Sequence, residues 1–541
     1  MRLLNEKRSI IIDEEKRKDR SKADAEDYSN AIFTYLTLAL GKLLDYNSVL
    51  TSWDASQGSI RNTFSRHAYA WTWDHAEGDV MQERTSYDWC ISSILKSLEG
   101  ISERSSKSVN ITIGDAAKPP SKYIPNAGFD VIITDPPYYG NVQYAEISDF
   151  FYVWFKRTLK DVYPEALNSL DTPKTDEAVA NKVRHGGSKL KDQFYESKMK
   201  EIFIAMNESL NSDGAFILWF AHKAGNAWSS TIHALLESGF NITALWGVRA
   251  EMERSLHISG KASLRTNIIM VCRKHTGKGG YIQDVLSTLE STMEPRLKEL
   301  EEYGIVGPDF IMGAQAEALK AASQLWPLQD PEEKLTPHQL LELVLDQAVG
   351  YVTNYVTRKI APQITGVDAT TKFYVLARHL YNDVVPYDDA RRLALACLGT
   401  TGEGDPVTEI ALDTGLGKLS TESVLGARTK VLSFTKPVER YRKSQLSTNE
   451  GAPIIDHIHH AVALIEENKK TQAEQALSMA GAVSLDVLNA LYQILQDPSV
   501  EKTNIQTLLL TISPESLITA RATAKPRTPK ITDYMEEEDK R

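Results

Sequence analysis

Cysteine is scarce in this sequence. The 541 residues include three cysteines, Cys90, Cys272 and Cys397, and no two of them form a Cys-x-x-Cys pair. This spacing argues against a disulfide framework and against a cysteine-based zinc site. It suits a protein of the reducing cytoplasm.

Long apolar runs and an excess of positive charge are missing as well. No apolar run approaches the length of a membrane span, and the first residues, Met-Arg-Leu-Leu-Asn-Glu-Lys, do not read as a signal peptide. We therefore expect a cytoplasmic protein with no membrane-spanning segment and no resident metal. The formal net charge is -11, so any contact with nucleic acid must come from a local basic surface.

A short apolar run that ends in Asp-Pro-Pro-Tyr is the most informative segment. Residues 130–140 read Asp-Val-Ile-Ile-Thr-Asp-Pro-Pro-Tyr-Tyr-Gly, and the β-branched run at 131–134 predicts a strand. Ligands bind beyond the carboxyl ends of the strands in an open α/β sheet, which is where the tetrapeptide is expected. Two prolines fix the backbone there and supply no N–H donors. The candidate catalytic residues are therefore Asp135, Pro136, Pro137 and Tyr138.

These groups suit methyl transfer to the exocyclic amine of a nucleobase. Such an amine is a poor nucleophile, because its lone pair is delocalised into the ring, and it carries two N–H donors. The Asp135 carboxylate and the Pro136 carbonyl can each accept one hydrogen, which turns the lone pair toward the methyl group of S-adenosylmethionine. Tyr138 can stack on a base that has left its helix. The alternative is an ordinary strand and Pro-Pro turn with a surface Asp and a packed Tyr.

The surrounding pattern predicts an α/β fold. Upstream, residues 109–116 read as an alternating strand that ends in Gly-Asp. Downstream, the pattern predicts a strand at 213–220, a helix at 229–237 and two further strands at 242–248 and 266–272. Because strands alternate with helices, we expect a parallel, doubly wound sheet.

The segment from Asp135 to Lys156 resembles the large adenine-specific DNA methylases that carry a domain of unknown function and often a zinc ribbon, enzymes frequently associated with phage defence. The similarity extends from about residue 28 to residue 399, including Arg61-Asn-Thr-Phe64, Ala221-His-Lys223 and Tyr387-Asp-Asp-Ala-Arg391. The resemblance implies a partial Rossmann-like class I methyltransferase sheet, followed by a mainly α-helical C-terminal region.

The same resemblance implies roles for residues near the tetrapeptide. Asp115, with Ala116 beside it, matches the acidic position that contacts the cofactor adenine. Tyr139 and Asn141 directly follow the tetrapeptide and are candidate substrate contacts. The implied cofactor is S-adenosylmethionine and the implied substrate is DNA.

One element of the family pattern is missing. Such methylases place a glycine-rich strand end, which holds the methionine part of the cofactor, well before the tetrapeptide, and residues 1–115 contain none. Residues 410–418 have an Asp-x-Gly-x-Gly arrangement, but their helical surroundings favour a loop or hairpin turn. We therefore expect a split enzyme whose cofactor loop comes from a separate polypeptide.

A basic stretch follows the helix that is expected after the tetrapeptide. Its members are Lys182, Arg184, His185, Lys189 and Lys191. They are candidates for contacts with DNA phosphates, with Lys182, Arg184 and Lys189 as the substrate-binding residues. A solvated surface loop is the alternative.

The length of 541 residues allows roughly two to four domains. We expect a helical N-terminal region at 1–108 that packs on the catalytic domain, a methyltransferase core at 109–275, a mainly helical accessory region at 281–520 for a partner or DNA, and a disordered tail at 522–541. An aromatic cluster at 150–155 is assigned to core packing.

Three local predictions concern the accessory region. Thr336-Pro337-His338-Gln339 has the pattern of a capped helix start. Residues 373–398 suggest two helices joined at Pro386, as in a helix-turn-helix-like element. The histidines at 457, 459 and 460 are expected on a helix surface rather than as metal ligands.

Together these features predict an S-adenosylmethionine-dependent DNA amino-methyltransferase, or the catalytic-motif subunit of one, with adenine N6 favoured over cytosine N4. Two alternatives remain open. One is an RNA methyltransferase that acts on a base amine. The other is a non-catalytic scaffold or DNA-recognition subunit that keeps the fold without binding the cofactor.

Overall fold

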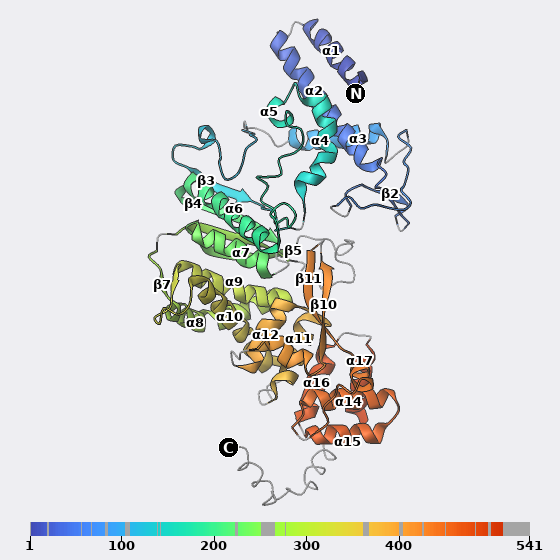
Figure 1. Ribbon diagram of the computed structural model, residues 1–541, viewed down its shortest axis with the longest axis vertical. Coiled ribbons are helices and arrows are strands. Elements are labelled where there is room, and N and C mark those ends of the chain that lie inside the picture. The colour runs from blue at the N-terminus through green and yellow to red at the C-terminus, as the bar shows by residue number, and fades with distance from the viewer. Residues whose placement is uncertain are drawn as a thin grey trace, which may run out of the picture. The chain divides into compact units, whose positions relative to one another are not determined.

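The computed structural model describes most of the chain. The described residues are 2–18, 21–55, 57–65, 68–81, 85–102, 109–137, 139–140, 142–221, 225–249, 266–275, 277–360, 367–399, 404–424, 427–449, 451–481, 483–495 and 499–511. The fold is mixed α/β (Figure 1). It divides into two compact units, which are described separately: unit 1 is Met1–Phe129 with Pro137–Asn211, and unit 2 is Asp130–Pro136 with Ser212–Arg541.

Unit 1 is mainly helical. Its elements are α1 (Arg2–Lys16), α2 (Lys22–Tyr46), β1 (Ser52–Asp54), β2 (Ser59–Arg61), α3 (Tyr87–Ser102), η1 (Ser121–Tyr123), α4 (Tyr144–Leu159), α5 (Pro164–Leu167) and α6 (Ser188–Ser209). Helix α2 begins where the Ser21 hydroxyl accepts from the backbone N–H of Asp24 at 3.1 Å. It packs against α1, α3 and α4.

An aromatic cluster holds α4 against the connection that follows β2. The rings of Phe64 and Phe150 lie 5.3 Å apart, and those of Phe64 and Phe151 lie 5.6 Å apart. Buried Phe33 and Tyr152 extend this core between α2 and α4. The prediction that residues 150–155 serve core packing is therefore confirmed.

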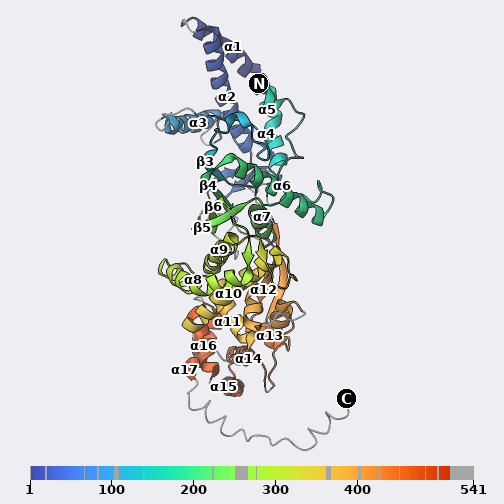
Figure 2. The same ribbon diagram turned by 90° about the vertical axis from the view of Figure 1, so that its left-hand side faces the viewer.

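Unit 2 contains a four-stranded sheet. Its strands are β3 (Phe129–Thr134), β4 (Leu210–Ala221), β6 (Thr266–Lys274) and β5 (Phe240–Arg249), in that spatial order, which Figure 2 shows. Helix α7 (Gly225–Glu237) connects β4 and β5 in sequence, and both α7 and α9 (Pro308–Gln324) pack against β5. The strands predicted at 131–134, 213–220, 242–248 and 266–272, and the helix at 229–237, are confirmed.

The prediction of a parallel sheet is wrong for β6. This strand runs antiparallel to both of its neighbours, β4 and β5, so that β4 and β5 are parallel to each other. The reason is connectivity. Two parallel strands of one sheet need a crossover between them, as α7 provides between β4 and β5. Consecutive strands that pair directly, as β5 and β6 do, can run antiparallel.

The strand predicted at 109–116 is absent. Residues 109–115, all of them described, form no strand, and Val109, Ile111 and Ile113 are 77%, 88% and 66% exposed. The alternating pattern favours a strand, but a strand needs a neighbour that accepts its backbone hydrogen bonds, and the described residues supply none here.

Strand β3 is poorly covered. It lies at one edge of the sheet. All six of its residues are described and none is buried; Val131 and Ile133 are 50% and 70% exposed. An apolar strand of an α/β sheet is normally covered on both faces, so β3 has the composition of an inner strand at the position of an edge strand.

The remaining elements of unit 2 are β7 (Gly280–Tyr281), α8 (Ile282–Glu302), β8 (Leu328–Gln329), α10 (Pro337–Ile360), α11 (Ala369–Tyr381), β9 (Val384–Pro386), α12 (Tyr387–Leu398), η3 (Thr408–Leu412), β10 (Gly417–Val424), β11 (Ala427–Phe434), α13 (Pro437–Arg442), α14 (Ile454–Glu466), α15 (Lys470–Ala480), α16 (Val483–Ile494) and α17 (Val500–Thr511). The capped start predicted for α10 is confirmed: Gln339 N–H donates to the Thr336 hydroxyl at 3.4 Å, and Thr336 N–H donates to the Gln339 side chain at 2.9 Å.

Two other local predictions for this region have mixed outcomes. Two helices do flank Pro386, but β9 lies between them and pairs with β11, so they are not joined by a tight turn. Residues 410–418 form the end of η3, a turn with Gly415 at φ +66°, and the start of the β10–β11 hairpin. This is the loop or hairpin turn that the sequence favours.

The prediction of surface histidines is wrong for two of the three, His457 and His459, whereas His460 is partly exposed. His457 and His459 are buried on α14, at 3% and 0% exposure, because apolar residues surround this helix on most sides. Arg440 lies 2.8 Å from Nδ1 of His459. Burial first, and then the nearby Arg440 charge, hold the pKa of His459 well below its usual value, so this side chain is neutral.

Two further observations concern the described residues alone. No three His, Cys, Asp or Glu side chains among them gather as a metal ion would require. Nor does any single helix in this part of the chain have the length and apolar character of a membrane span, although α15 and α16, bent by 111° at their junction, meet that test as a pair. The tail predicted at 522–541 lies outside the described residues.

Candidate functional site

The tetrapeptide directly follows β3. The strand ends at Thr134, the Asp135 side chain that comes next is exposed, and Pro136 is buried. A carboxylate at the carboxyl end of a strand has the position that the sequence predicts for an acceptor group. Tyr138 and Asn141 lie outside the described residues.

The turn that follows belongs to unit 1 and is tightly held. Tyr139 adopts φ +56°, a left-handed conformation that is uncommon for residues other than glycine. Its carbonyl accepts from Ala180 N–H at 3.0 Å. A side chain at Gly140 would place its Cβ 2.6 Å from the carbonyl oxygen of Ala180, so this position requires glycine. Unusual backbone conformations held this way are typical of functional sites.

Helix α6 fixes the same turn from another side. The buried Tyr195 donates its hydroxyl to the Pro137 carbonyl at 2.9 Å, and the Tyr139 N–H donates to the same oxygen at 2.9 Å. Both acceptor positions of that carbonyl are therefore used. The Pro137 carbonyl is therefore not available to accept an amine hydrogen from a base, and the role of the Pro136 carbonyl stays a prediction.

The Tyr139 side chain is also engaged. Its hydroxyl donates to Asp192, and Lys191 lies 3.0 Å from the hydroxyl oxygen and 4.4 Å from the ring centre. The rings of Tyr139 and Tyr195 meet edge to face at 5.2 Å. Burial and the Asp192 carboxylate raise the pKa of Tyr139, so the phenol stays neutral. These contacts make Tyr139 a support of the turn.

Asp115 is held by the same helix. Its carboxylate accepts from Ala117 N–H at 2.9 Å and from Lys198 Nζ at 3.0 Å. Partial burial pushes the pKa of Asp115 upward, but the Ala117 N–H and Lys198 bring it below its usual value, so the carboxylate is ionised. The side chain is 27% exposed, which leaves part of it accessible to a ligand hydroxyl or amine. Ala116 beside it is exposed.

Residues on one face of α6 therefore organise two predicted sites. Lys191, Tyr195 and Lys198 follow the spacing i, i+4, i+7, which places them on one side of a helix. Sequence reasoning missed Tyr195 and Lys198. Their helical spacing is visible in the sequence, but nothing in it shows that their targets are Pro137 and Asp115.

The structure separates the members of the basic stretch. Arg184 is bound to Glu146, to Glu177 at 2.6 Å and to the Lys174 carbonyl at 3.0 Å, and its side chain is 16% exposed. Lys182 and Lys189 are exposed. The charge of Arg184 is thus balanced by two carboxylates, whereas the two lysines are the members placed to meet a phosphate.

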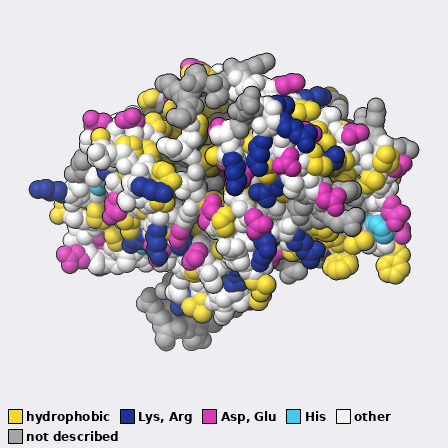
Figure 3. Space-filling view, turned by 90° about the horizontal axis from the view of Figure 1, so that it is seen from above, with side chains coloured by type: hydrophobic (Ala, Val, Ile, Leu, Met, Phe, Trp, Pro, Cys, Tyr) yellow, Lys and Arg dark blue, Asp and Glu magenta, His cyan; other side chains and the backbone are white. Residues whose placement is uncertain are grey.

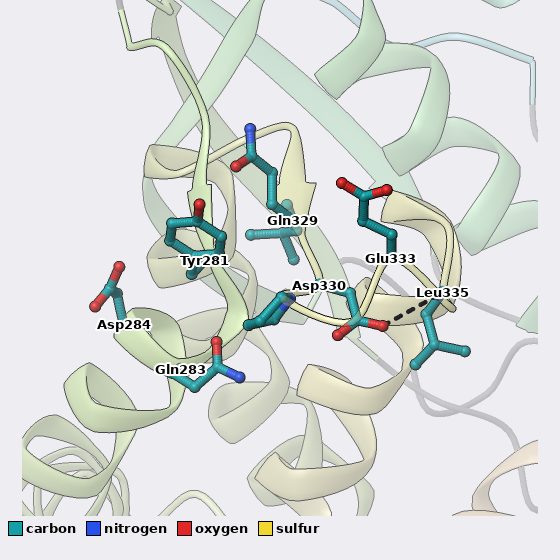
Figure 4. Close-up of a pocket in the computed structure, with 9 residues that line it drawn as sticks. Tyr281, Gln283, Asp284, Gln329, Asp330, Glu333 and Leu335 are labelled. Atoms are coloured by element: carbon teal, nitrogen blue, oxygen red, sulfur yellow. Dashed lines mark hydrogen bonds between the residues drawn. The ribbon is translucent and has the colours of Figure 1, made fainter.

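The described surface has no extended face of a single charge in the view of Figure 3, where Lys and Arg side chains alternate with Asp and Glu. A cavity of about 750 Å³ lies in unit 2, near the start of α8 and the end of β8 (Figure 4). Within it the Asp330 carboxylate accepts from the backbone N–H groups of Glu332, Lys334 and Leu335. These bonds engage the Asp330 carboxylate in stabilising the loop that follows it. None of the predicted site residues lines the cavity.

Comparison with protein-family models gave no match, and comparison with curated proteins and with solved structures gave none either. The family resemblance of the segment that follows β3 therefore stays a prediction.

Proposed function

We propose that this protein is an S-adenosylmethionine-dependent DNA amino-methyltransferase, or the catalytic-motif subunit of one, with adenine N6 as the favoured target. The observation that carries the proposal is the position of the Asp-Pro-Pro segment, directly after β3, together with the turn of fixed conformation that follows it. In this proposal the four-stranded sheet is part of a Rossmann-like class I methyltransferase sheet, and the elements from α8 onward form the accessory region.

The chemistry assigned to this chain is acceptance and orientation. Asp135 and the Pro136 carbonyl accept the two amine hydrogens and stabilise the positive charge that develops on the nitrogen. Tyr138 stacks on the base. Asp115, an ionised and partly accessible carboxylate, would hold the adenosine part of S-adenosylmethionine, which supplies the methyl group when bound.

A separate polypeptide that carries the glycine-rich strand completes the proposed enzyme. Two features support this. The sequence lacks that motif before Asp115. In addition, β3 exposes Val131 and Ile133 at the edge of its sheet, where a further strand and its covering helices could pack. The resemblance suggests a defence or modification system as the setting.

Asp135→Ala tests the catalytic assignment. Because the carboxylate acts mainly in the transition state, methylation should fall by roughly a hundredfold or more while DNA affinity is largely kept. Asp130→Ala, at the other end of β3, is the matched control and should retain activity. Full methylation in Asp135→Ala would refute the assignment, and transfer to RNA in place of DNA would favour the alternative substrate.

Calorimetric titration with S-adenosylmethionine tests the split-enzyme part. The chain alone should bind the cofactor weakly, because the close backbone approach of a glycine-rich turn is missing, and the partner should restore both cofactor binding and methylation. Tight binding without a partner would refute the split. DNA binding with no cofactor binding, even when the partner is present, would favour a non-catalytic recognition subunit.

A further inference from the structure

Another cavity of unit 2 lies between β5, α8 and α9. Its volume is about 570 Å³, within the range of roughly 300–1,000 Å³ that small-molecule sites occupy. Helix α9 packs on β5, and α8 packs on α9, as Figure 2 shows. The strand and both helices contribute to the walls, so the cavity belongs to one compact unit.

Part of the cavity lining is apolar and belongs to the core. Ile268 of β6, Leu300 of α8 and Met312 of α9 line the cavity and are 1%, 3% and 8% exposed. The two helices approach each other closely here because α9 carries a glycine: a Cβ at Gly313 would overlap the Leu300 side chain. Packed side chains therefore fix the shape of this part of the wall, and the cavity is preformed.

Two large aromatic side chains line the same cavity and stay exposed. Trp246 on β5 is 53% exposed, and Tyr303, which follows α8, is 75% exposed. The faces of aromatic rings carry partial negative charge and attract cations, and tryptophan attracts them most strongly. The exposed part of the wall is therefore suited to a ligand that is both apolar and positively charged.

The charged side chains of the lining leave one negative charge in excess. Arg296 and Glu299, both on α8, form an ion pair in which Nη1 lies 2.6 Å from a carboxylate oxygen. The Asp309 carboxylate, in the first turn of α9, has no hydrogen bond or ion pair with another described residue. Because Glu299 balances Arg296, the Asp309 charge is available to a ligand.

We propose that this cavity binds a small organic monocation, an ammonium ion with an apolar body. Asp309 balances the charge of the ligand, the Trp246 ring attracts its cationic group, and the aliphatic lining covers its apolar body. An anion would be repelled by the excess negative charge. Among the described residues assigned to methyl transfer none lines the cavity, so the inference does not rest on the proposed function.

The experiment is a titration of the full chain, followed by NMR signals of the ligand, with three probes of similar shape. Choline carries one positive charge, glycine betaine adds a carboxylate to the same trimethylammonium group, and 3,3-dimethylbutan-1-ol replaces the charged nitrogen with carbon. Choline should bind at least roughly fivefold more tightly than either other probe, since the other two lose the net positive charge that Asp309 attracts. Equal or tighter binding of another probe, or no saturable binding of choline, would overturn the proposal.

Variants locate the bound choline. Asp309→Asn should weaken its binding roughly fivefold, and Trp246→Ala roughly three- to thirtyfold, whereas Trp246→Phe should keep part of the affinity. Glu302→Gln removes an exposed carboxylate that does not line the cavity and should bind choline like the parent chain. Unchanged affinity in both Asp309→Asn and Trp246→Ala, or an equal loss in Glu302→Gln, would overturn the site. The comparison of probes uses the parent chain, so it decides the proposal even if a variant fails to fold.

Discussion

Replacing Arg184 with alanine should loosen the loop that supports the Tyr139 turn. The guanidinium binds Glu146 on α4 and Glu177 in the loop, and the three side chains are 16%, 35% and 11% exposed. Burial alone lowers the pKa of Arg184, but the two carboxylates raise it above its usual value. Alanine would leave both carboxylates partly buried without their cation.

The free-energy cost of Arg184→Ala lies between two limits. Exposed ion pairs contribute about 0.2–1 kcal/mol, and breaking a fully buried pair costs about 3–5 kcal/mol. Partial exposure and the two partners of Arg184 place the cost at about 2–3 kcal/mol. Local opening of the loop should then be roughly 30- to 150-fold more frequent.

Hydrogen–deuterium exchange of the full chain is the suitable assay, because it reports opening of one segment. The amides of Ala180, His185 and Gly187 each donate to a backbone carbonyl in or next to this loop, and their exchange should accelerate in Arg184→Ala. Lys182→Ala, an exposed position in the same loop, should stay within about 0.5 kcal/mol of the parent chain. Equal exchange in the two variants would refute the reasoning. Arg184 would then again be a candidate for contact with a DNA phosphate.

Three other predictions concern packing, DNA contact and pH. Gly140→Ala should lower stability by about 1–3 kcal/mol, measured as a shifted urea midpoint, because its Cβ would meet the Ala180 carbonyl at 2.6 Å; an unshifted midpoint would contradict this. Replacing Lys182 and Lys189 with alanine should weaken binding to all DNA sequences alike and flatten its salt dependence, whereas a surface loop without a DNA role predicts no change in either. Burial lowers the pKa of His233 to about 4, below its value of about 6.5 in an unfolded chain. The neutral form of His233 therefore contributes to folding stability above about pH 6.5, and this contribution is lost as the pH falls toward 4. Between pH 7.5 and pH 5, the free energy of unfolding should fall less in His233→Phe than in the parent chain. Equal decreases in the two chains would show that His233 is not a source of the pH dependence.

Local signals in the sequence were sufficient for much of the fold. The four strands of the sheet and α7 follow from apolar runs and helical spacing, and the start of α10 follows from Thr336 and Gln339. Each of these patterns depends on neighbours in sequence. The same holds for the placement of Asp135 at the end of β3.

Predictions that depend on distant partners were less successful. The 109–116 pattern lacks a strand neighbour, and the orientation of β6 depends on which strand it joins. Burial of His459 depends on the elements packed around α14, among them α13, which brings Arg440 to 2.8 Å from Nδ1 of His459. At the candidate site, the support of the Pro137 carbonyl by Tyr195 links residues 58 positions apart, which no local pattern shows.

The uncovered apolar side chains of β3 also affect the fate of the chain in a cell. A strand edge with Val131 and Ile133 exposed resembles the surfaces that chaperones and proteases recognise on incompletely folded proteins. We expect the lifetime of this chain to follow the abundance of whatever covers that edge. If the proposed partner covers that edge, synthesis of this chain in excess of the partner should produce turnover or aggregates.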